Sequence, residues 1–177
     1  VIILDDIYNE FSSGAKDITG IRDFLKHLYN PDASEENKLK YVCFFGDASY
    51  DYKDRITGNN NIVPIKLSDI SFNLATSWVT DDFYVMLDEH EGTMNPTIYT
   101  IETPTRLNHT IDVASSRIPV STLTQAKDVV NKILTYYDKS SLGDWRNTIT
   151  MLADDIDNPF SDASLQPGLD RIAESIK

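Results

Sequence analysis

The 177-residue sequence predicts an α/β fold with a mostly parallel sheet flanked by helices. Short, continuous apolar runs, as in strands that are covered on both faces, alternate with longer segments whose apolar residues recur at helical spacing. The resulting order is strand, helix, strand, several strands, helix, strand, helix, which is the pattern of a parallel sheet with crossover helices. The length suits one domain or one large subdomain.

Composition narrows the class of protein. Apolar residues make up 41% and charged residues 25%, which excludes a chain that is disordered throughout. The net charge is −12 and the isoelectric point is about 4.5, so the surface repels phosphate backbones and we expect no nucleic-acid partner. A single cysteine excludes an intrachain disulfide. No apolar run reaches the roughly 18 residues that a membrane span needs.

The first third of the chain predicts two strands and a helix. Residues 1–4 form an apolar run that two aspartates close, which is typical of a short buried strand. Asp17 is a suitable N-cap for the next segment, whose apolar residues recur at helical spacing from Ile18 to Leu28. Residues 41–45 are apolar throughout, which predicts a central parallel strand covered on both faces.

The middle of the chain is less regular. Residues 48–61 are rich in Asp, Asn, Gly and Tyr and predict a long loop. The run 62–67 contains a proline, which restricts it to an edge strand. Residues 83–87 and 98–101 are further strand candidates.

The last third predicts two strands and two helices. A strand is expected at 110–114, and another at 148–153. Between them, Thr122 and Gln125 have the spacing of a capping box at the start of an amphipathic helix. A second amphipathic helix is expected from residue 165 onward.

Acidic residues follow three of the predicted strands. In an open parallel sheet, acids at the carboxyl ends of strands can ligate a cation or orient a catalytic group. Aspartate also ends strands for a simpler reason, because its carboxylate accepts hydrogen bonds from loop N–H groups. The residues concerned are Asp5, Asp6, Asp47, Asp154 and Asp155.

Two acid-rich segments are candidates for a structural calcium ion. Side-chain oxygens, the ligands that Ca²⁺ prefers, are dense in both segments. Neither segment matches the twelve-residue calcium loop, and acidic clusters in a protein of this charge are mostly solvated. The candidate ligands are Asp81, Asp82, Asp154, Asp155 and Asp157.

We assign no catalytic residue in this chain. Cys43 lies in the middle of a predicted strand, where a thiol is usually a buried small hydrophobe, whereas a nucleophile needs exposure and a nearby base. The three histidines, His27, His90 and His109, have no second ligand at the usual zinc spacing.

Five segments, in order and over nearly the whole chain, resemble the gingipain-like cysteine peptidases. The first runs from Ile7 to Leu25, and the second is Phe44-Phe-Gly-Asp-Ala-Ser-Tyr-Asp-Tyr-Lys53. The third is Thr80-Asp-Asp-Phe-Tyr84 with the nearby Leu87-Asp88. The fourth is Ser116-Arg-Ile-Pro-Val120 with the helix that follows, and the fifth is Trp145-Arg-Asn147 with residues 152–155. Ser116 departs from the family, which usually has glycine there.

The resemblance implies a caspase-like, gingipain-type layered fold with two side-by-side subdomains. Residues 1–109 would form the first subdomain, and residues 110–177 would begin the second. The family's catalytic His and Cys lie in later motifs that match no position of this sequence. The resemblance therefore implies a segment that is truncated before the catalytic motifs and inactive alone.

Within the family, the sequence is most similar to the signal peptidases of type IX secretion in Bacteroidetes. This implies protein or peptide substrates, namely the tail signals of exported cargo, and an extracytoplasmic place at the cell surface or outer membrane. The remaining part of the peptidase domain and outer-membrane secretion components are the implied partners. Several family members bind calcium.

Within the family, a general secreted protease stays open, and so do two functions of other classes. A noncatalytic cell-surface binding or scaffold module could use the same peptidase-like shell without the catalytic pair. A Mg²⁺-dependent phosphotransfer domain could use Asp5 or Asp6, because an apolar strand that ends in aspartate resembles a phosphoacceptor site. No suitable Thr and Lys partners follow on later predicted strand ends.

Overall fold

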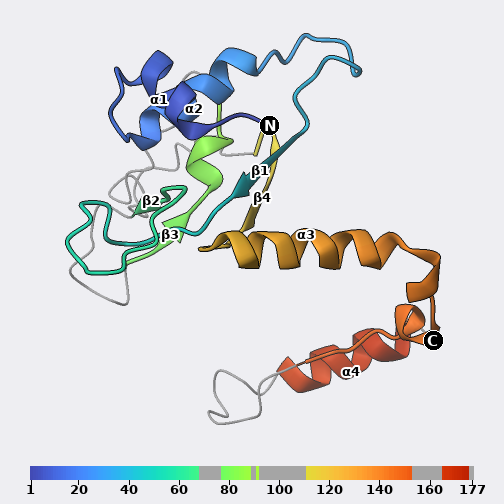
Figure 1. Cartoon of the computed structure of the whole chain (residues 1–177). Helices are drawn as coiled ribbons and strands as arrows, with labels where there is room; N and C mark the ends of the chain where they lie inside the picture. The colour runs from blue at the N-terminus through green and yellow to red at the C-terminus, as the bar shows by residue number, and fades with distance from the viewer. Residues whose placement is uncertain (68–76, 89–90, 92–110, 153–164, 176–177) are drawn as a thin grey trace. The chain divides into compact units, whose positions relative to one another are not determined.

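The computed structural model describes residues 1–67, 77–88, 91, 111–152 and 165–175, which fall into two compact units, 1–127 and 128–177. Figure 1 shows the elements of each unit. The first unit contains α1 (Leu4–Phe11), α2 (Ile18–Leu28), β1 (Tyr41–Phe45), β2 (Lys66–Leu67), β3 (Val79–Thr80), the 3₁₀ turn η1 (Asp82–Tyr84) and β4 (Ala114–Ile118). Helix α3 (Leu123–Tyr137) runs from the first unit into the second, which contains the 3₁₀ turns η3 (Lys139–Ser141) and η4 (Asp144–Asn147) and helix α4 (Leu165–Ser175).

The chain begins with a helix rather than the predicted strand over residues 1–4. Ile7 and Tyr8 are buried on one face of α1, and Leu4 and Phe11 pack against the same core. These four residues follow helical spacing. The prediction was wrong because it rested on the short apolar run over residues 1–4, which is also typical of a strand. Asp5 and Asp6 consequently lie in the first turn of a helix, where acidic side chains interact favourably with the helix dipole.

Helix α2 confirms the prediction at its start. The Asp17 carboxylate accepts a hydrogen bond from the Thr19 N–H at 2.8 Å, as an N-cap should. Ile21 and Leu25 bury the apolar face, and α2 packs beside α1 (Figure 1). The helix ends at Leu28, with the Tyr29 N–H bonded back to the Leu25 carbonyl.

The predicted parallel sheet is confirmed as the β1–β4 pair, in the register Tyr41↔Ala114 to Phe45↔Ile118. β1 occupies its predicted range, whereas the strand expected at 110–114 begins only at Ala114. The expectation that β1 is covered on both faces is wrong for the residues that the structure describes. Only Phe44 of this strand is buried, while Tyr41, Cys43 and Phe45 are exposed.

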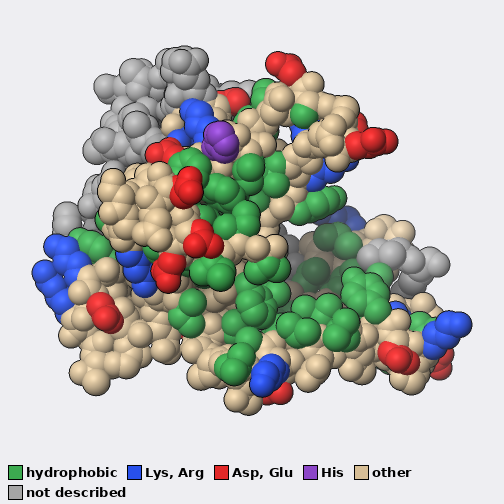
Figure 2. Space-filling model, turned by 45° about the horizontal axis from the view of Figure 1, so that its top comes forward, with side chains coloured by type: hydrophobic (Ala, Val, Ile, Leu, Met, Phe, Trp, Pro, Cys, Tyr) green, Lys and Arg blue, Asp and Glu red, His purple; other side chains and the backbone are tan. Residues whose placement is uncertain are grey.

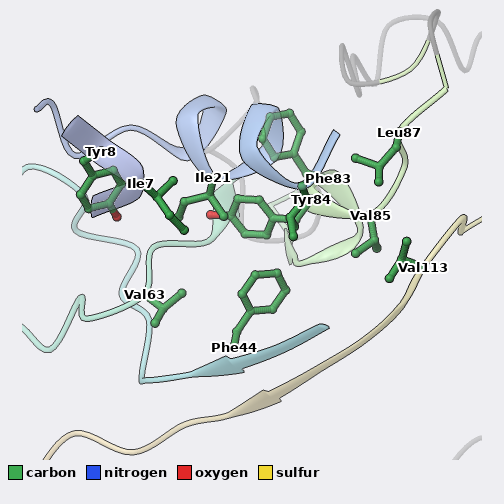
Figure 3. Packing of buried hydrophobic residues seen from close by; sticks show 11 residues of the cluster. Ile7, Tyr8, Ile21, Phe44, Val63, Phe83, Tyr84, Val85, Leu87 and Val113 are labelled. Atoms are coloured by element: carbon green, nitrogen blue, oxygen red, sulfur yellow. The ribbon is translucent and has the colours of Figure 1, made fainter. Parts of the chain in front are cut away.

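The core of the first unit lies between the two helices and the covered face of β1. Figure 3 shows Tyr84 between Ile21 of α2 and Phe44 of β1. The Phe44 and Tyr84 ring centroids are 4.9 Å apart. Residues from α1, α2, β1 and the segment after β3 complete the cluster, together with Val63 and Val113.

Residues 83–87 are buried, but they do not form the predicted strand. The N–H groups of Val85 and Met86 both donate to the Asp82 carbonyl at 3.0 Å, so the segment opens as the 3₁₀ turn η1. Tyr84 and Val85 are fully buried. A short apolar run cannot distinguish a buried strand from a buried turn by its pattern alone.

The other predicted strands are shorter than expected or absent among the described residues. The edge strand at 62–67 reduces to β2, which pairs antiparallel with β3. Residues 148–152 form no strand, and the candidate at 98–101 lies outside the described residues. The capping box at Thr122 and Gln125 is confirmed by reciprocal bonds of 3.1 and 3.2 Å.

The second unit carries many apolar side chains at its surface. Helix α3 has no buried residue, and α4 confirms the predicted helix from residue 165 onward. On the face drawn in Figure 2, hydrophobic side chains reach the surface, with acidic and basic side chains among them. Among the described residues, no helix has both the length and the apolar character that crossing a bilayer requires.

Candidate functional site

Arg117 of β4 makes the densest set of polar contacts among the described residues. Its guanidinium forms a two-pronged ion pair with Asp81, at 2.8 Å from Nε to Oδ2 and 2.6 Å from Nη2 to Oδ1. It also donates to the carbonyls of Gly46 and Val63 at 2.9 and 2.8 Å, and to that of Pro64 at 3.3 Å. We call these five residues the Arg117 cluster.

The β1–β4 register explains why Arg117 reaches this position. Arg117 pairs with Phe44, and paired residues of a parallel sheet project to the same face. The guanidinium carbon consequently lies 5.5 Å from the Phe44 ring centroid, within the range of a cation–π contact. The Arg117 and Asp81 side chains are 13% and 17% exposed, so the pair is largely shielded from water.

The carboxyl end of β1 is fixed by its neighbour. The N–H groups of Gly46 and Asp47 donate to the carbonyls of Ile118 and Val120, both at 3.0 Å, which extends the pairing beyond the strands. The Asp47 carboxylate accepts from the Ala48 N–H at 2.9 Å and from the Ser121 hydroxyl at 2.8 Å. Of the three acidic strand ends, this one is confirmed, and here the carboxylate stabilises the loop.

Gly46 sits where the chain has no room for a side chain. A Cβ at this position would lie 2.7 Å from Val63 Cγ2 and 2.8 Å from Ile62 Cγ2. The close approach lets the Asp47 carbonyl accept from the N–H groups of Ile62 and Val63, both at 3.0 Å. These bonds close the base of the loop that follows β1.

A second arginine, Arg22, forms hydrogen bonds with the backbone of residues 83–86, which follow β3. Arg22 of α2 is buried and donates to the carbonyls of Phe83 at 3.1 Å and Met86 at 2.6 Å. The Asp112 carboxylate accepts from the Leu87 N–H at 2.6 Å and from the Tyr29 hydroxyl at 3.1 Å. Hydrogen bonds to side chains therefore fix residues 83–87 at their start, through Arg22, and at their end, through Arg22 and Asp112.

Two buried tyrosines in this region resist ionisation. Burial, followed by the nearby carboxylates of Asp5 and Asp17, raises the pKa of Tyr8 to about 12. Burial, followed by the Asp81 charge, raises the pKa of Tyr84 well above its ordinary value. The Tyr84 hydroxyl donates to the Pro64 carbonyl at 2.6 Å, which connects the core to the Arg117 cluster.

The structure places the calcium candidates in different settings. The Asp81 carboxylate is engaged by Arg117, and Asp82 opens η1 beside it. Asp154, Asp155 and Asp157 lie outside the described residues. Within the described part of the chain, no group of three or more His, Cys, Asp or Glu side chains could hold a metal ion. Calcium binding stays a prediction.

The expectation that Cys43 is buried is wrong, because its strand has one uncovered face in the described structure. Its strand neighbour Phe44 points into the core instead. His27 lies on α2 with its ring centroid 6.0 Å from that of Phe11, while His90 and His109 lie outside the described residues. The expectation that this chain holds no catalytic residue stays a prediction.

The Arg117 cluster brings together three of the five segments that resemble the gingipain-like peptidases. Gly46 comes from the second segment, Asp81 from the third and Arg117 from the fourth. Arg22 of the first segment bonds to the third. Sequence reasoning did not identify Arg117 or Arg22 as centres of contact. The available signal was an arginine inside an otherwise apolar or small-residue strand, which must find partners if it is buried.

Comparisons with known proteins identify a family and a similar fold. The family model described as Peptidase family C25 matches residues 1–177. Among solved structures, the chain is similar to "Crystal structure of dimeric latent PorU from Porphyromonas gingivalis", with a TM-score of 0.57 and 23% identity. The match covers 84% of this chain and 14% of that one, so this chain spans a small part of that protein. No curated protein matches the sequence.

Proposed function

Because this chain belongs to peptidase family C25, the gingipain family, we propose that it is the front part of a gingipain-like cysteine endopeptidase. The observation that carries the proposal is the family match over residues 1–177. It is supported by the Arg117 cluster, in which the segments that resemble the family meet at one end of the parallel strands. Sites of open α/β sheets lie beyond the carboxyl ends of their strands. In this proposal the segment forms one wall of the substrate cleft, and the substrates are proteins or peptides.

The finer role that we propose is the signal peptidase of type IX secretion, which processes exported cargo. The order of the five resembling segments supports this role, and the fold shared with PorU is compatible with it. The protein would then act outside the cytoplasm, at the cell surface or outer membrane. The remaining part of the peptidase domain and outer-membrane secretion components would be its partners.

We also propose that residues 1–177 cleave nothing by themselves. Neither Cys43 nor any of the three histidines matches the family's catalytic motifs. Cys43 lies in the middle of β1, and its register partner is Ser116. A cysteine nucleophile needs a base within hydrogen-bond reach.

The test compares peptide cleavage by the full-length protein with cleavage by residues 1–177, each with and without a thiol-alkylating agent. We expect cleavage by the full-length protein that alkylation abolishes, and none by the segment. Cys43→Ser in the full-length protein is the matched control, and it should cleave at the unmodified rate.

The alternative outcomes separate the rival functions. If the full-length protein cleaves no peptide and alkylation changes nothing, the chain is a binding or scaffold module on a peptidase-like fold. If Cys43→Ser abolishes cleavage, the nucleophile lies in this segment and our assignment is wrong. A second assay tests the finer role: the full-length protein is incubated with a cargo protein that carries a type IX tail signal. Removal of the tail would support the role.

A further inference from the structure

The loop from Ser49 to Asn60 follows the carboxyl end of β1 and holds its own shape. The Asp51 side chain is buried, and its Oδ2 accepts from the N–H groups of Arg55 at 2.5 Å and Ile56 at 2.7 Å. The Asp51 carbonyl accepts from the Asn59 side-chain amide at 2.8 Å. We call this segment the 49–60 loop. These three bonds brace the loop from within.

The base of the 49–60 loop is tied to the rest of the first unit. The Ser49 N–H donates to the Asn61 side chain at 3.4 Å, and the Lys16 ammonium donates to the Asn61 carbonyl. The Asp47 bonds to Ile62 and Val63 close the loop just below this point. The loop is therefore anchored at its base and braced inside, which is the arrangement of a preorganised recognition loop.

While the Asp51 carboxylate turns inward, the loop presents large apolar side chains outward. Tyr50 is 72% exposed, Tyr52 is 63% exposed and Ile56 is 48% exposed. Exposed aromatic side chains on a fixed loop are typical of binding surfaces, because tyrosine offers a large contact area at a small cost in conformational entropy.

The charges of the loop distinguish it from the rest of the chain. Lys53 and Arg55 are exposed, and the Lys53 ammonium lies 5.4 Å from the Tyr52 ring centroid. Asp51 is turned inward, which leaves Asp54 as the exposed acid of the loop. The outward side chains thus carry two cations and one anion on a protein whose net charge is −12. Lys53 and Arg55 offer a carboxylate-bearing partner two cationic groups to pair with.

We propose that the 49–60 loop binds an extended peptide segment in which acidic and apolar side chains alternate. The tyrosines would pack against the apolar side chains, while Lys53 and Arg55 would pair with the carboxylates. The proposal rests on the proposed peptidase function, since it names the class of substrate segment that the wall of the cleft would recognise.

Peptide binding to the full-length protein tests the proposal, with the protein alkylated so that cleavage does not compete. The probes are two fluorescent ten-residue peptides, one alternating glutamate with leucine and the other alternating lysine with leucine. Fluorescence anisotropy measures the Kd of each. We expect the acidic peptide to bind at least about tenfold more tightly than the basic one.

Matched variants locate the binding surface. Tyr52→Ala and Lys53→Glu should each weaken binding of the acidic peptide by about tenfold. Tyr41→Ala removes a tyrosine that is 79% exposed on β1, and Lys127→Glu reverses an exposed lysine of α3, so both should bind like the unmodified protein. Asp51→Ala removes the internal brace without removing a contact side chain. It should weaken binding and accelerate hydrogen exchange over residues 49–60.

Three results would overturn the proposal: equal binding of both peptides, equal weakening by Tyr41→Ala and Tyr52→Ala, or no binding because another part of the full-length protein protects residues 49–60 from exchange. If the unmodified full-length protein cleaves no peptide but its binding still depends on the loop residues, the peptidase function is refuted and this proposal is not. If the full-length protein cleaves peptides but the loop variants leave the Kd of the acidic peptide unchanged, this proposal is refuted and the peptidase function is not.

Discussion

Single residues in the first unit differ in how much change they tolerate. Gly46 is the clearest case, because its neighbours Ile62 and Val63 are β-branched and cannot easily rotate away from a new methyl group. We expect Gly46→Ala to lower the free energy of unfolding by about 1–3 kcal/mol. Urea denaturation of the purified protein measures this change.

Gly168→Ala is the control for that substitution. Gly168 lies in α4, where an added Cβ would meet no atom within 4 Å, and alanine favours a helix over glycine by roughly 0.5–1 kcal/mol. Gly168→Ala should leave stability unchanged or raise it slightly. Equal destabilisation by both variants would show that the close approach at Gly46 is not the cause.

Two buried tyrosine hydroxyls are expected to behave in opposite ways. The Tyr84 hydroxyl donates to the Pro64 carbonyl, whereas the Tyr8 hydroxyl has no partner among the described residues. Tyr84→Phe should therefore cost about 1 kcal/mol, while Tyr8→Phe should be neutral or stabilising, because it removes a buried polar group that makes no bond. Thermal unfolding of both variants checks the contrast, and a larger loss for Tyr8→Phe would contradict it.

At the scale of elements, the Arg117–Asp81 pair joins β4 to the segment that precedes η1. Removing one member leaves a largely buried charge without its partner, so Arg117→Met and Asp81→Asn should each destabilise the protein, by about 3 kcal/mol for the arginine. The double variant should lose less than the sum of the two single losses.

A double-mutant cycle of chemical unfolding measures this coupling. The exposed pair Lys40–Glu35, at 3.0 Å, is the matched control, and an exposed pair of this kind should show little coupling. If the losses for Arg117 and Asp81 simply add, the two residues act independently, and the remaining bonds of Arg117 to the carbonyls carry its effect.

For the whole molecule, the raised tyrosine pKa values set the response to alkaline pH. Unfolded tyrosines lose their protons near pH 10, whereas folded Tyr8 does so near pH 12. Between these values the folded state binds more protons than the unfolded state, so stability falls as pH rises. Below pH 10 the contribution of Tyr8 is fully present.

Urea midpoints at pH 8, 10 and 11.5 test this response. We expect a progressive decline above pH 10, with a slope of up to about 1.4 kcal/mol per pH unit for each buried tyrosine that stays protonated. Tyr8→Phe should reduce the slope, since phenylalanine does not titrate. A midpoint that is constant to pH 11.5 would contradict the assignment.

The sequence alone determined the fold class, the start of α2, the range of β1, the N-caps of α2 and α3, and the family. These features follow from local chemistry, since apolar spacing, capping side chains and ordered motif segments are visible without any distant contact. The strands expected at 1–4 and 83–87 did not form, nor did the one expected at 148–153 over its described residues 148–152, and the reason is the converse. A short apolar run indicates only that a segment is buried. Whether the segment forms a helix, a turn or a strand depends on the residues that pack against it in the folded protein.

Only the tertiary structure decided what meets at the carboxyl end of β1. Gly46, Asp81 and Arg117 are far apart in the sequence, and nothing in their local spacing indicates that they bond to one another. Arg117 reaches this place because the β1–β4 register puts its side chain on the same covered face of the sheet as Phe44. There, an unpaired guanidinium would be costly, and a carboxylate with three carbonyls satisfies it.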